Sequence, residues 1–326
     1  MRLLITGSAG FVGKHTVDWF LKKTDWEIVG LDSFRHLGDA ERLRHDERYR
    51  VVCHDLNAPV SKRTSANIGH IDYVINAASM SHVDTSITDP VWFWETNTRL
   101  IGNILEWSRQ RGVEKFIQVS TDEVFGPAPK GYAHHEWDTI RPSNPYAASK
   151  AAQEALTHAY WRTYGLPCFI TNCMNMVGTH QDPEKFLPKV VSRVLNDKEV
   201  VIHGTEGNIG SRMYLDCRNL ADAWLFILKN VEAVKYVDDI SALPRFNVAG
   251  LEEIDNLELA QRVADIIGKP LKYRLEDFHT ARPGHDLRYA LDSSKLQCLG
   301  WKQPIPLEQT LVEVIEHVKE NKDWQE

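Results

Sequence analysis

A tyrosine and a lysine in a short run are the residues of this chain best suited to chemistry. Tyr146 and Lys150 stand in the sequence Tyr-Ala-Ala-Ser-Lys, and on a helix this spacing places both side chains on one face. The ammonium stabilises a phenolate, so the tyrosine can take a proton from a hydroxyl group as hydride leaves the adjacent carbon. The pair predicts oxidation of an alcohol. Tyr-x-x-x-Lys pairs also occur on ordinary amphipathic helices, so the surrounding residues decide whether this pair is catalytic.

Two adjacent carboxylic acids precede this pair in the chain. Asp122 and Glu123 follow Thr121 directly. One acid and one base side by side can remove a proton from carbon and protonate a departing hydroxyl group. The sequence therefore predicts that the oxidised intermediate is dehydrated.

A glycine-rich turn near the N-terminus predicts a dinucleotide site. Gly7, Gly10 and Gly13 follow a predicted strand and open a predicted helix, where they allow a tight turn and close approach to a pyrophosphate at the helix N-terminus. A glycine triplet alone is often only a loop, but Asp32 ends the next predicted strand about twenty residues later. Its carboxylate would bind the adenosine ribose and repel a 2′-phosphate, which favours NAD over NADP. Arg35 nearby argues in the other direction.

Other residues at predicted strand ends complete the expected cofactor site. Asp55 and Leu56 are expected near the adenine, and residues 77–79 near the phosphates and ribose, although ordinary strand-end residues would look the same. Asn97 is a poor former of helix interiors, so it either bonds locally or orients the lysine through water. The predicted cofactor contacts are Gly7, Gly10, Phe11, Val12, Gly13, Asp32, Ser33, Asp55, Leu56, Ala77, Ala78, Ser79, Thr96, Asn97, Tyr146, Lys150 and Cys173.

The elements that position these residues alternate in the first half of the chain. Short apolar runs predict strands at Arg2–Thr6, Glu27–Asp32, Tyr49–His54, Tyr73–Ala77, Lys115–Ser120 and Cys168–Asn172. Longer mixed segments predict helices at Val12–Lys23, Ala40–His45, Val91–Arg111 and Pro145–Tyr164. Strands that are apolar throughout need a sheet covered on both faces. The fold class is therefore predicted as α/β, with a Rossmann-type doubly wound parallel sheet.

The pattern changes beyond about Met176 to short elements separated by proline and glycine. Helices are predicted at Glu184–Asn196, Asn219–Asn230, Leu257–Ile267 and Leu307–Lys319. We predict an NAD-binding domain in residues 1–175 with returning segments near 212–250, and a smaller, discontinuous α/β substrate lobe in most of 176–326.

Composition excludes several classes of protein. The 326 residues carry a formal charge of −7 and a pI near 6.1, which gives no electrostatic footprint for nucleic acid or an anionic membrane. The 5 cysteines form no Cys-x-x-Cys pair and are expected to be reduced thiols without zinc. His134 and His135 have no third ligand at a useful spacing, so no metal site is predicted. No segment looks like a signal peptide or a membrane span, and a cytoplasmic protein is expected.

Taken together, these motifs resemble the extended short-chain dehydrogenase/reductase family and, within it, the dTDP-glucose 4,6-dehydratases. The more specific matches are the runs 81–84, 120–126, 183–186 and 282–286. The resemblance implies a Rossmann lobe, tightly held NAD, a nucleotide-sugar site in the cleft and a homodimer formed through two long helices.

The resemblance also implies a division of roles. Tyr146 would deprotonate the sugar O4, and Lys150 would lower the pKa of the tyrosine and bind the nicotinamide ribose. Thr121 would hydrogen-bond the sugar. Glu123 would remove the C5 proton, which a C4 ketone makes acidic, and Asp122 would protonate the departing C6 hydroxyl group. Hydride would then return to C6.

On the substrate side, the chain departs from the family pattern at two places. Asn175 is followed by Met176 and Val177 where the family has Asn-Tyr, and Gly210 stands where the family has an arginine. Arg212 lies two residues further on and could reach the same cleft from the same face of a strand. The predicted substrate contacts are Ser81, His82, Thr121, Asn175, Lys185, Phe186, Val201, His203, Arg212, Asn247, Arg282 and His285.

Three functions are consistent with the scaffold. The first is a nucleotide-sugar 4,6-dehydratase, and the second is another enzyme such as a UDP-sugar 4-epimerase or a decarboxylase. The third is a non-catalytic NAD-binding protein. Asp122 and Glu123 argue against the second, and the complete set of reactive residues argues against the third, because an idle site does not need a repelling carboxylate pair.

Overall fold

A parallel sheet of seven strands forms the centre of the molecule. The computed structural model describes residues 1–35, 38–234, 242–277, 286–321 and 324. In spatial order the strands are β12 (Arg245–Val248), β6 (Cys168–Cys173), β5 (Lys115–Thr121), β4 (Tyr73–Asn76), β1 (Arg2–Thr6), β2 (Glu27–Asp32) and β3 (Tyr49–Cys53). Every neighbouring pair is parallel. The six strands predicted in the first half of the chain are confirmed.

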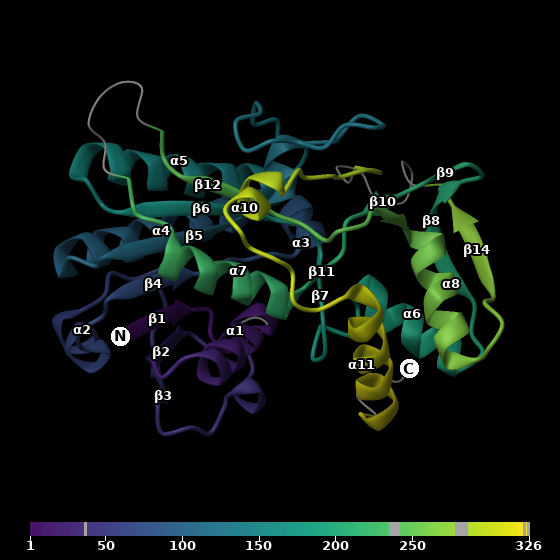
Figure 1. The fold of residues 1–326 in the computed structure, drawn as a ribbon, viewed down its shortest axis with the longest axis horizontal. Coiled ribbons are helices and arrows are strands. Elements are labelled where there is room, and N and C mark those ends of the chain that lie inside the picture. Colours follow the sequence, from purple (N-terminus) through teal and green to yellow (C-terminus); the bar gives the residue numbers. More distant parts are fainter. Residues whose placement is uncertain (36–37, 235–241, 278–285, 322–323, 325–326) are drawn as a thin grey trace.

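Helices cover both faces of this sheet, as a buried parallel sheet requires (Figure 1). On one face, α1 (Phe11–Lys23) and α7 (Cys217–Asn230) pack on strand residues that include Leu3 and Ile5. On the other face, α2 (Lys62–Ile68), α4 (Pro90–Arg111) and α5 (Pro145–Tyr164) pack on residues that include Leu4. Alternate residues of a strand point to opposite faces, so β1 contributes to both cores. The predicted doubly wound α/β fold is confirmed.

The two long helices α4 and α5 begin and end at sequence signals. Asp89 caps α4 and Asn144 caps α5, each with a side-chain oxygen that accepts a backbone N–H, and a proline follows each cap. Gly112 and Gly165 end these helices in the left-handed conformation. The start of α5 is thus fixed by local chemistry, which in turn fixes where Tyr146 and Lys150 lie.

The C-terminal part packs around a separate apolar cluster. Helices α6 (Phe186–Leu195), α8 (Asn256–Ile267) and α11 (Leu307–Glu320) share this cluster with β8 (Val200–Thr205). Strands β14 (Tyr273–Glu276) and β9 (Asn208–Ile209) flank β8. The remaining elements are η1 (Ala40–Arg42), α3 (Val83–Thr88), η2 (Asp122–Phe125), β7 (Met176–Val177), β10 (Ser211–Arg212), β11 (Leu215–Asp216), β13 (Ile254–Asp255) and α10 (Ser294–Cys298).

One predicted helix is much shorter than expected. The segment predicted as Ala40–His45 forms only the single 3₁₀ turn η1, after which Leu43 is extended. No residue of η1 is buried and only Leu43, which follows it, packs against the core among residues 40–45, so little apolar contact stabilises a longer helix. The division into two domains near residue 175 stays a prediction, although β12 and α7 pack with the main sheet.

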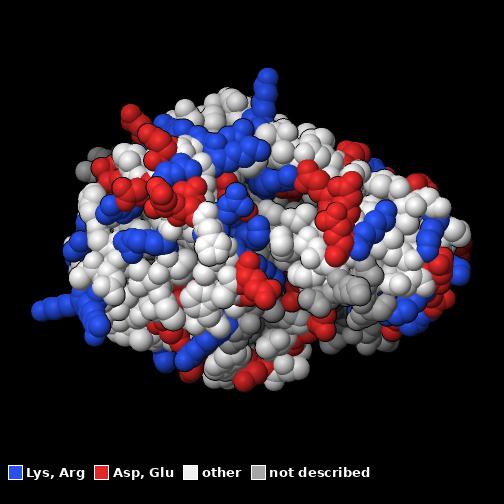
Figure 2. Space-filling view, turned by 90° about the horizontal axis from the view of Figure 1, so that it is seen from below, with Lys and Arg blue, Asp and Glu red and all other residues white. Residues whose placement is uncertain are grey.

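The surface and the thiols agree with the composition. Figure 2 shows basic and acidic side chains interspersed over the face seen from below. All five cysteines are free thiols, and three of them are buried. Among the described residues, none of the helices is long and apolar enough to cross a membrane.

Candidate active site

The reactive residues meet at the carboxyl ends of β5 and β6, beside the start of α5. Thr121 ends β5 and pairs in register with Cys173, which ends β6. The turn η2 carries Asp122 and Glu123 directly after β5. The sheet thus brings together residues that are separated in the sequence by more than one secondary-structure element. Carboxyl ends of parallel strands are where ligands bind in open α/β sheets.

Asp122 is buried and Glu123 is half-buried, and the pair is only partly satisfied by hydrogen bonds. The Thr121 hydroxyl donates to Asp122 Oδ1 at 2.8 Å and accepts the Glu123 N–H at 3.3 Å. Asp122 Oδ2 is buried without a hydrogen-bond partner among the described residues. Burial raises the pKa of both carboxyls, and the charge of Asp122 raises the pKa of Glu123 further. One carboxyl can therefore keep a proton as an acid while the other acts as a base.

Asn144 belongs to the site, although the sequence analysis did not single it out. Its Nδ2 donates to Glu123 Oε2 at 2.9 Å, and its Oδ1 accepts the Ala147 N–H at 2.8 Å. One side chain thus caps α5 and orients the carboxylate. The Asn-Pro pair at the start of a predicted helix was the available signal, because it marks an N-cap followed by a first-turn proline.

Tyr146 lies half-buried near the carboxylates. Burial raises the pKa of its phenol well above the ordinary value, the charge of Glu123 acts in the same direction, and the Thr121 hydroxyl opposes them. The ring of Phe93 meets the phenol ring edge-on, with centroids 6.2 Å apart. A nearby cation is needed for this phenol to release its proton near neutral pH.

Lys150 is the cation that the helix spacing predicted on the same face as Tyr146. Its Nζ donates to the Val119 carbonyl at 2.6 Å and to Gln153 Oε1 at 2.7 Å. Burial lowers the pKa of the ammonium to about 8. The lysine therefore keeps its charge at neutral pH and loses it in mild alkali.

The glycine turn has the geometry of an anion site. Gly7 has a positive φ of 71°, and a Cβ on Gly13 would lie 2.0 Å from the Gly7 carbonyl oxygen. Only glycine fits this close approach between the turn and the helix. Gly10 provides no side-chain cap for α1, so the first N–H groups of the helix are available to a ligand such as a pyrophosphate. Phe11 and Val12, two predicted contacts, form this first turn.

Asp32 is tied to the same turn. Its two carboxylate oxygens accept the N–H groups of Ala9 and Phe34, each at 2.9 Å. Each oxygen keeps a further lone pair for a ribose hydroxyl. Arg35, which argued for a 2′-phosphate, instead forms an ion pair with Asp55 at 2.7 Å. The predicted contacts Ser33 and Leu56 adjoin these carboxylates in the chain.

Asn97 fastens the segment after β4 to α5. Its Oδ1 accepts the Met80 N–H at 2.8 Å and the Ser79 hydroxyl at 3.2 Å, and its Nδ2 donates to Ser149 Oγ at 2.8 Å. These bonds join Asn97 to segments distant in the sequence, so they are tertiary contacts and not the local bonding that was one of the two predicted roles. The predicted contacts Ala77, Ala78 and Thr96 lie in the same region, at the end of β4 and on α4.

Arg212 lies on β10 at the side of the carboxylate pair. Its charge lowers the pKa of both Asp122 and Glu123, against the larger effect of burial. The guanidinium stacks on the Tyr289 ring at 4.6 Å. It also donates to the carbonyls of Leu287 and Asp286 at 2.6 and 2.8 Å. The expected cation is thus at the site, and part of its donor set holds the chain segment that follows residue 285.

The other predicted substrate contacts are spread around the two parts of the molecule. Asn247 is fully buried on β12, where its Nδ2 donates to the His134 carbonyl at 2.8 Å. His82 caps α3, Lys185 precedes α6, and Asn175 is exposed between β6 and β7. Their roles stay predictions, as do those of Ser81, Phe186, Val201 and His203. Arg282 and His285 lie outside the described residues.

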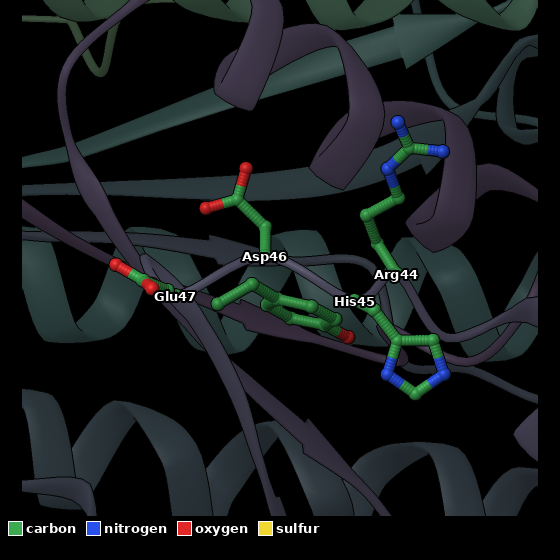
Figure 3. Close-up of a pocket in the computed structure, with 5 residues that line it drawn as sticks. Arg44, His45, Asp46 and Glu47 are labelled. Carbon is green, nitrogen blue, oxygen red and sulfur yellow. The ribbon is translucent and has the colours of Figure 1, made fainter.

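An open hollow elsewhere on the surface is unrelated to this chemistry. It is lined by Arg44, His45, Asp46, Glu47 and Tyr49, and Figure 3 shows the Glu47 and His45 side chains pointing to different sides. It lies at the amino-terminal start of β3, the end of the sheet opposite Thr121. No group of His, Cys, Asp and Glu able to hold a metal ion occurs among the described residues.

Comparison with known proteins gives one family. The sequence matches the NAD dependent epimerase/dehydratase family over residues 3–242. A probable dTDP-glucose 4,6-dehydratase of Sinorhizobium fredii is 33% identical over 342 residues, which cover 99% of this chain and 94% of that protein.

Solved structures agree with the sequence match. DesIV, a dTDP-glucose 4,6-dehydratase from Streptomyces venezuelae with NAD and TYD bound, has a TM-score of 0.86 at 29% identity and covers 100% of this chain and 99% of its own. A UDP-glucose 4-epimerase of Thermus thermophilus in complex with NAD also has a TM-score of 0.86 at 29% identity, with 98% and 99% covered. Overall shape therefore does not separate the two reactions.

Proposed function

This chain belongs to the NAD dependent epimerase/dehydratase family, and from this premise we propose that it is an NAD-dependent nucleotide-sugar 4,6-dehydratase of the dTDP-glucose type. The reaction converts a nucleotide-linked hexose to the 4-keto-6-deoxy sugar and water. One observation carries the choice of reaction: the carboxylate pair Asp122 and Glu123 lies at the end of β5, close enough to raise the pKa of Tyr146. Relatives with dTDP-glucose dehydratase activity in their names support the same choice.

The chain's residues fit the cofactor. The uncapped start of α1 and the close approach of Gly13 to Gly7 suit a pyrophosphate, and Asp32 suits a ribose. When bound, NAD accepts hydride from the sugar C4 and returns it to C6. The ion pair between Arg35 and Asp55 supports NAD rather than NADP, because it engages the cation that would otherwise favour a 2′-phosphate.

Tyr146 and Lys150 serve the oxidation and the reduction. The phenol takes the proton of the C4 hydroxyl group as hydride leaves. Burial and the carboxylates raise the pKa of Tyr146, and Lys150, on the same face of α5, is the cation whose charge would lower the cost of the phenolate. Thr121 lies beside the phenol and the carboxylates, where its hydroxyl can hydrogen-bond the sugar.

The carboxylate pair serves the elimination of water. Glu123 removes the C5 proton, whose acidity the neighbouring C4 ketone increases. Asp122 gives its proton to the departing C6 hydroxyl group; burial raises the pKa of both carboxyls, so the pair can hold one proton for this step. Asn144 orients Glu123, and Arg212 keeps part of the pair ionised.

An isotope experiment tests this function. Substrate deuterated at C4 should give a 4-keto-6-deoxy product that carries deuterium at C6, without net formation of NADH, because the hydride returns within each turnover. Mass spectrometry of the product and absorbance at the NADH band provide the two measurements. Stoichiometric release of NADH would show a simple dehydrogenase instead.

The second candidate is a UDP-sugar 4-epimerase. The similarity to the Thermus thermophilus enzyme supports it as strongly as fold similarity can. Such an enzyme would return hydride to C4 and would make no use of Asp122 and Glu123 as an acid and a base. Incubation with UDP-glucose, UDP-galactose and dTDP-glucose separates the two functions, since only elimination gives a keto-deoxy product.

We further propose a cytoplasmic homodimer that pairs through α4 and α5. These helices pack against each other, and their large exposed apolar side chains include Val91, Trp92, Trp94 and Tyr164. Five free thiols suit a reducing compartment. Sedimentation of the protein alone, compared with a variant in which Trp92 and Trp94 are changed to serine, tests the dimer.

A further inference from the structure

The Lys150 ammonium has two fixed acceptors on different elements. Val119 O on β5 lies 2.6 Å from Nζ, and Gln153 Oε1 on α5 lies 2.7 Å away. An ammonium has three N–H donors in all. Two of them are therefore held by the protein, which leaves one for a ligand and fixes the direction in which it points.

Gln153 connects Asn97 to the lysine. The sequence analysis left two roles open for Asn97, local bonding or orientation of the lysine through water. In the structure Gln153 Nε2 donates to the Asn97 backbone carbonyl at 2.9 Å, while Oε1 faces the ammonium. The amide cannot be turned around, since that would place an NH₂ group against the ammonium and an oxygen against the carbonyl. The glutamine therefore connects α4 to the lysine directly.

The amide of Gln153 is also fixed from the sheet side. Gln118 Nε2 donates to Gln153 Oε1 at 3.0 Å, and Gln118 Oε1 accepts from Asn76 Nδ2 at 2.8 Å. Asn76 Oδ1 accepts the Thr6 hydroxyl at 2.6 Å, and Thr6 Oγ1 accepts the Ala78 N–H at 3.0 Å. Thr6, Asn76, Gln118 and Gln153 all have 0% of their surface exposed. This buried chain crosses β1, β4 and β5 from the residue before the glycine turn to the lysine.

A buried amide chain of this kind is costly unless every group is paired. The distances above pair each amide at both of its ends, so the chain has one arrangement. A residue that only filled the volume would not need to be polar, because a methionine is of similar length and avoids the desolvation of an amide. What the amide adds is an acceptor placed against the ammonium.

We propose that Gln153 is a positioning residue for the reaction: it holds the Lys150 ammonium against Val119 with one N–H directed to the ligand. The proposal rests on the proposed function in one respect only, which is the identity of the ligand that accepts this N–H.

The charges around the lysine define the expected effect. Cys173 on β6 and Glu154 on α5 favour the charged form, and burial opposes it. Neutral acceptors such as Gln153 also favour the ammonium, because a hydrogen bond to the charged form stabilises that form. Loss of the Gln153 acceptor should therefore lower the pKa of Lys150 below its value of about 8. The charge that supports the Tyr146 phenolate would then be lost at a lower pH.

Three variants of the full-length enzyme with bound cofactor test this. Gln153→Met removes the acceptor and keeps the volume, whereas Gln153→Glu keeps an acceptor and adds charge. Thr157→Val is the matched control, because Thr157 is as buried on the same helix and its hydroxyl donates to the Gln153 backbone carbonyl at 2.8 Å. NMR of ¹³Cε-labelled lysine, with the Lys150 signal assigned from Lys150→Met, gives the lysine pKa without any substrate. The pH profile of kcat gives the effect on turnover.

Gln153→Met should lower the lysine pKa by about one unit or more, the scale of a hydrogen bond to a charged group. The alkaline limb of kcat should move down equally, with little change in KM. Gln153→Glu should raise the lysine pKa above that of the unmodified enzyme, and Thr157→Val should lower the melting temperature without moving the titration.

Equal lysine titrations in Gln153→Met and Thr157→Val would overturn the proposal. If Gln153→Met does not fold, an unchanged lysine pKa in Gln153→Glu would overturn it equally. Failure of the proposed function would look different, since absence of keto-deoxy product from the unmodified enzyme leaves the lysine titration unaffected.

Discussion

Lys150 and the Asp122–Glu123 pair serve one site, yet the protein holds them in opposite ways. The lysine is enclosed by acceptors that are themselves fixed by a buried chain of amides. The carboxylates have one oxygen without a partner among the described residues, raised pKa values and a cation, Arg212, that is only near them. The fold thus fixes the residue that serves oxidation and reduction, whereas the carboxylates that serve elimination keep hydrogen-bonding capacity for the substrate.

The largest effects are expected from two variants that stop the reaction at different steps, one at the oxidation and the other at the elimination. Tyr146→Phe should block the first oxidation, so that the bound cofactor stays oxidised. Glu123→Gln should allow that oxidation and slow elimination by roughly 10²–10⁴-fold, the usual loss for a missing acid or base, so that reduced cofactor accumulates on the enzyme. Stopped-flow absorbance of the bound cofactor measures both. If both variants keep the cofactor fully oxidised, the roles assigned to Tyr146 and Glu123 are wrong.

A smaller effect is expected from the cation beside the carboxylates. Arg212→Ala should raise KM by roughly the 1.5–3 kcal/mol of a charge-assisted hydrogen bond, if the guanidinium meets the diphosphate. It should also move the acidic limb of the pH profile upward, because the charge of Arg212 lowers the pKa of both carboxyls. Arg274→Ala, at an exposed arginine on β14, is the control. An unchanged KM together with an unmoved acidic limb would place Arg212 outside the site.

The smallest effect concerns stability. Glu123 has a raised pKa in the folded protein, so the fold binds its proton more tightly than the unfolded chain does. This carboxyl contributes stability below its unfolded pKa and loses it as pH rises through the folded pKa. Glu123→Gln should therefore melt higher than the unmodified protein at pH 8, but not at pH 4. One pKa unit is worth about 1.4 kcal/mol, or roughly 2–4 °C for a protein of this size. Calorimetry in which the difference does not grow with pH would contradict this.

Most of the fold and the reactive residues could be predicted from the sequence because their signals are local. The apolar runs that became β1 and β5, the glycine turn and the spacing of Tyr146 and Lys150 each depend on a few neighbouring residues. The helix expected at Ala40–His45 ends after one turn for the complementary reason, since no residue of that turn is buried. The family followed from the same local motifs, and the sequence match confirms it.

The tertiary structure alone decided which groups surround those residues. Asn144 reaches Glu123, Arg212 reaches the carboxylate pair, and Gln118 reaches Gln153 through contacts that no spacing rule describes. Hydrogen-bond partners and desolvation depend on where strands and helices from distant parts of the chain meet. The sequence by itself therefore determined which chemistry is possible, and the packing of β5, α4 and α5 decided which groups hold their protons and which are left for the substrate.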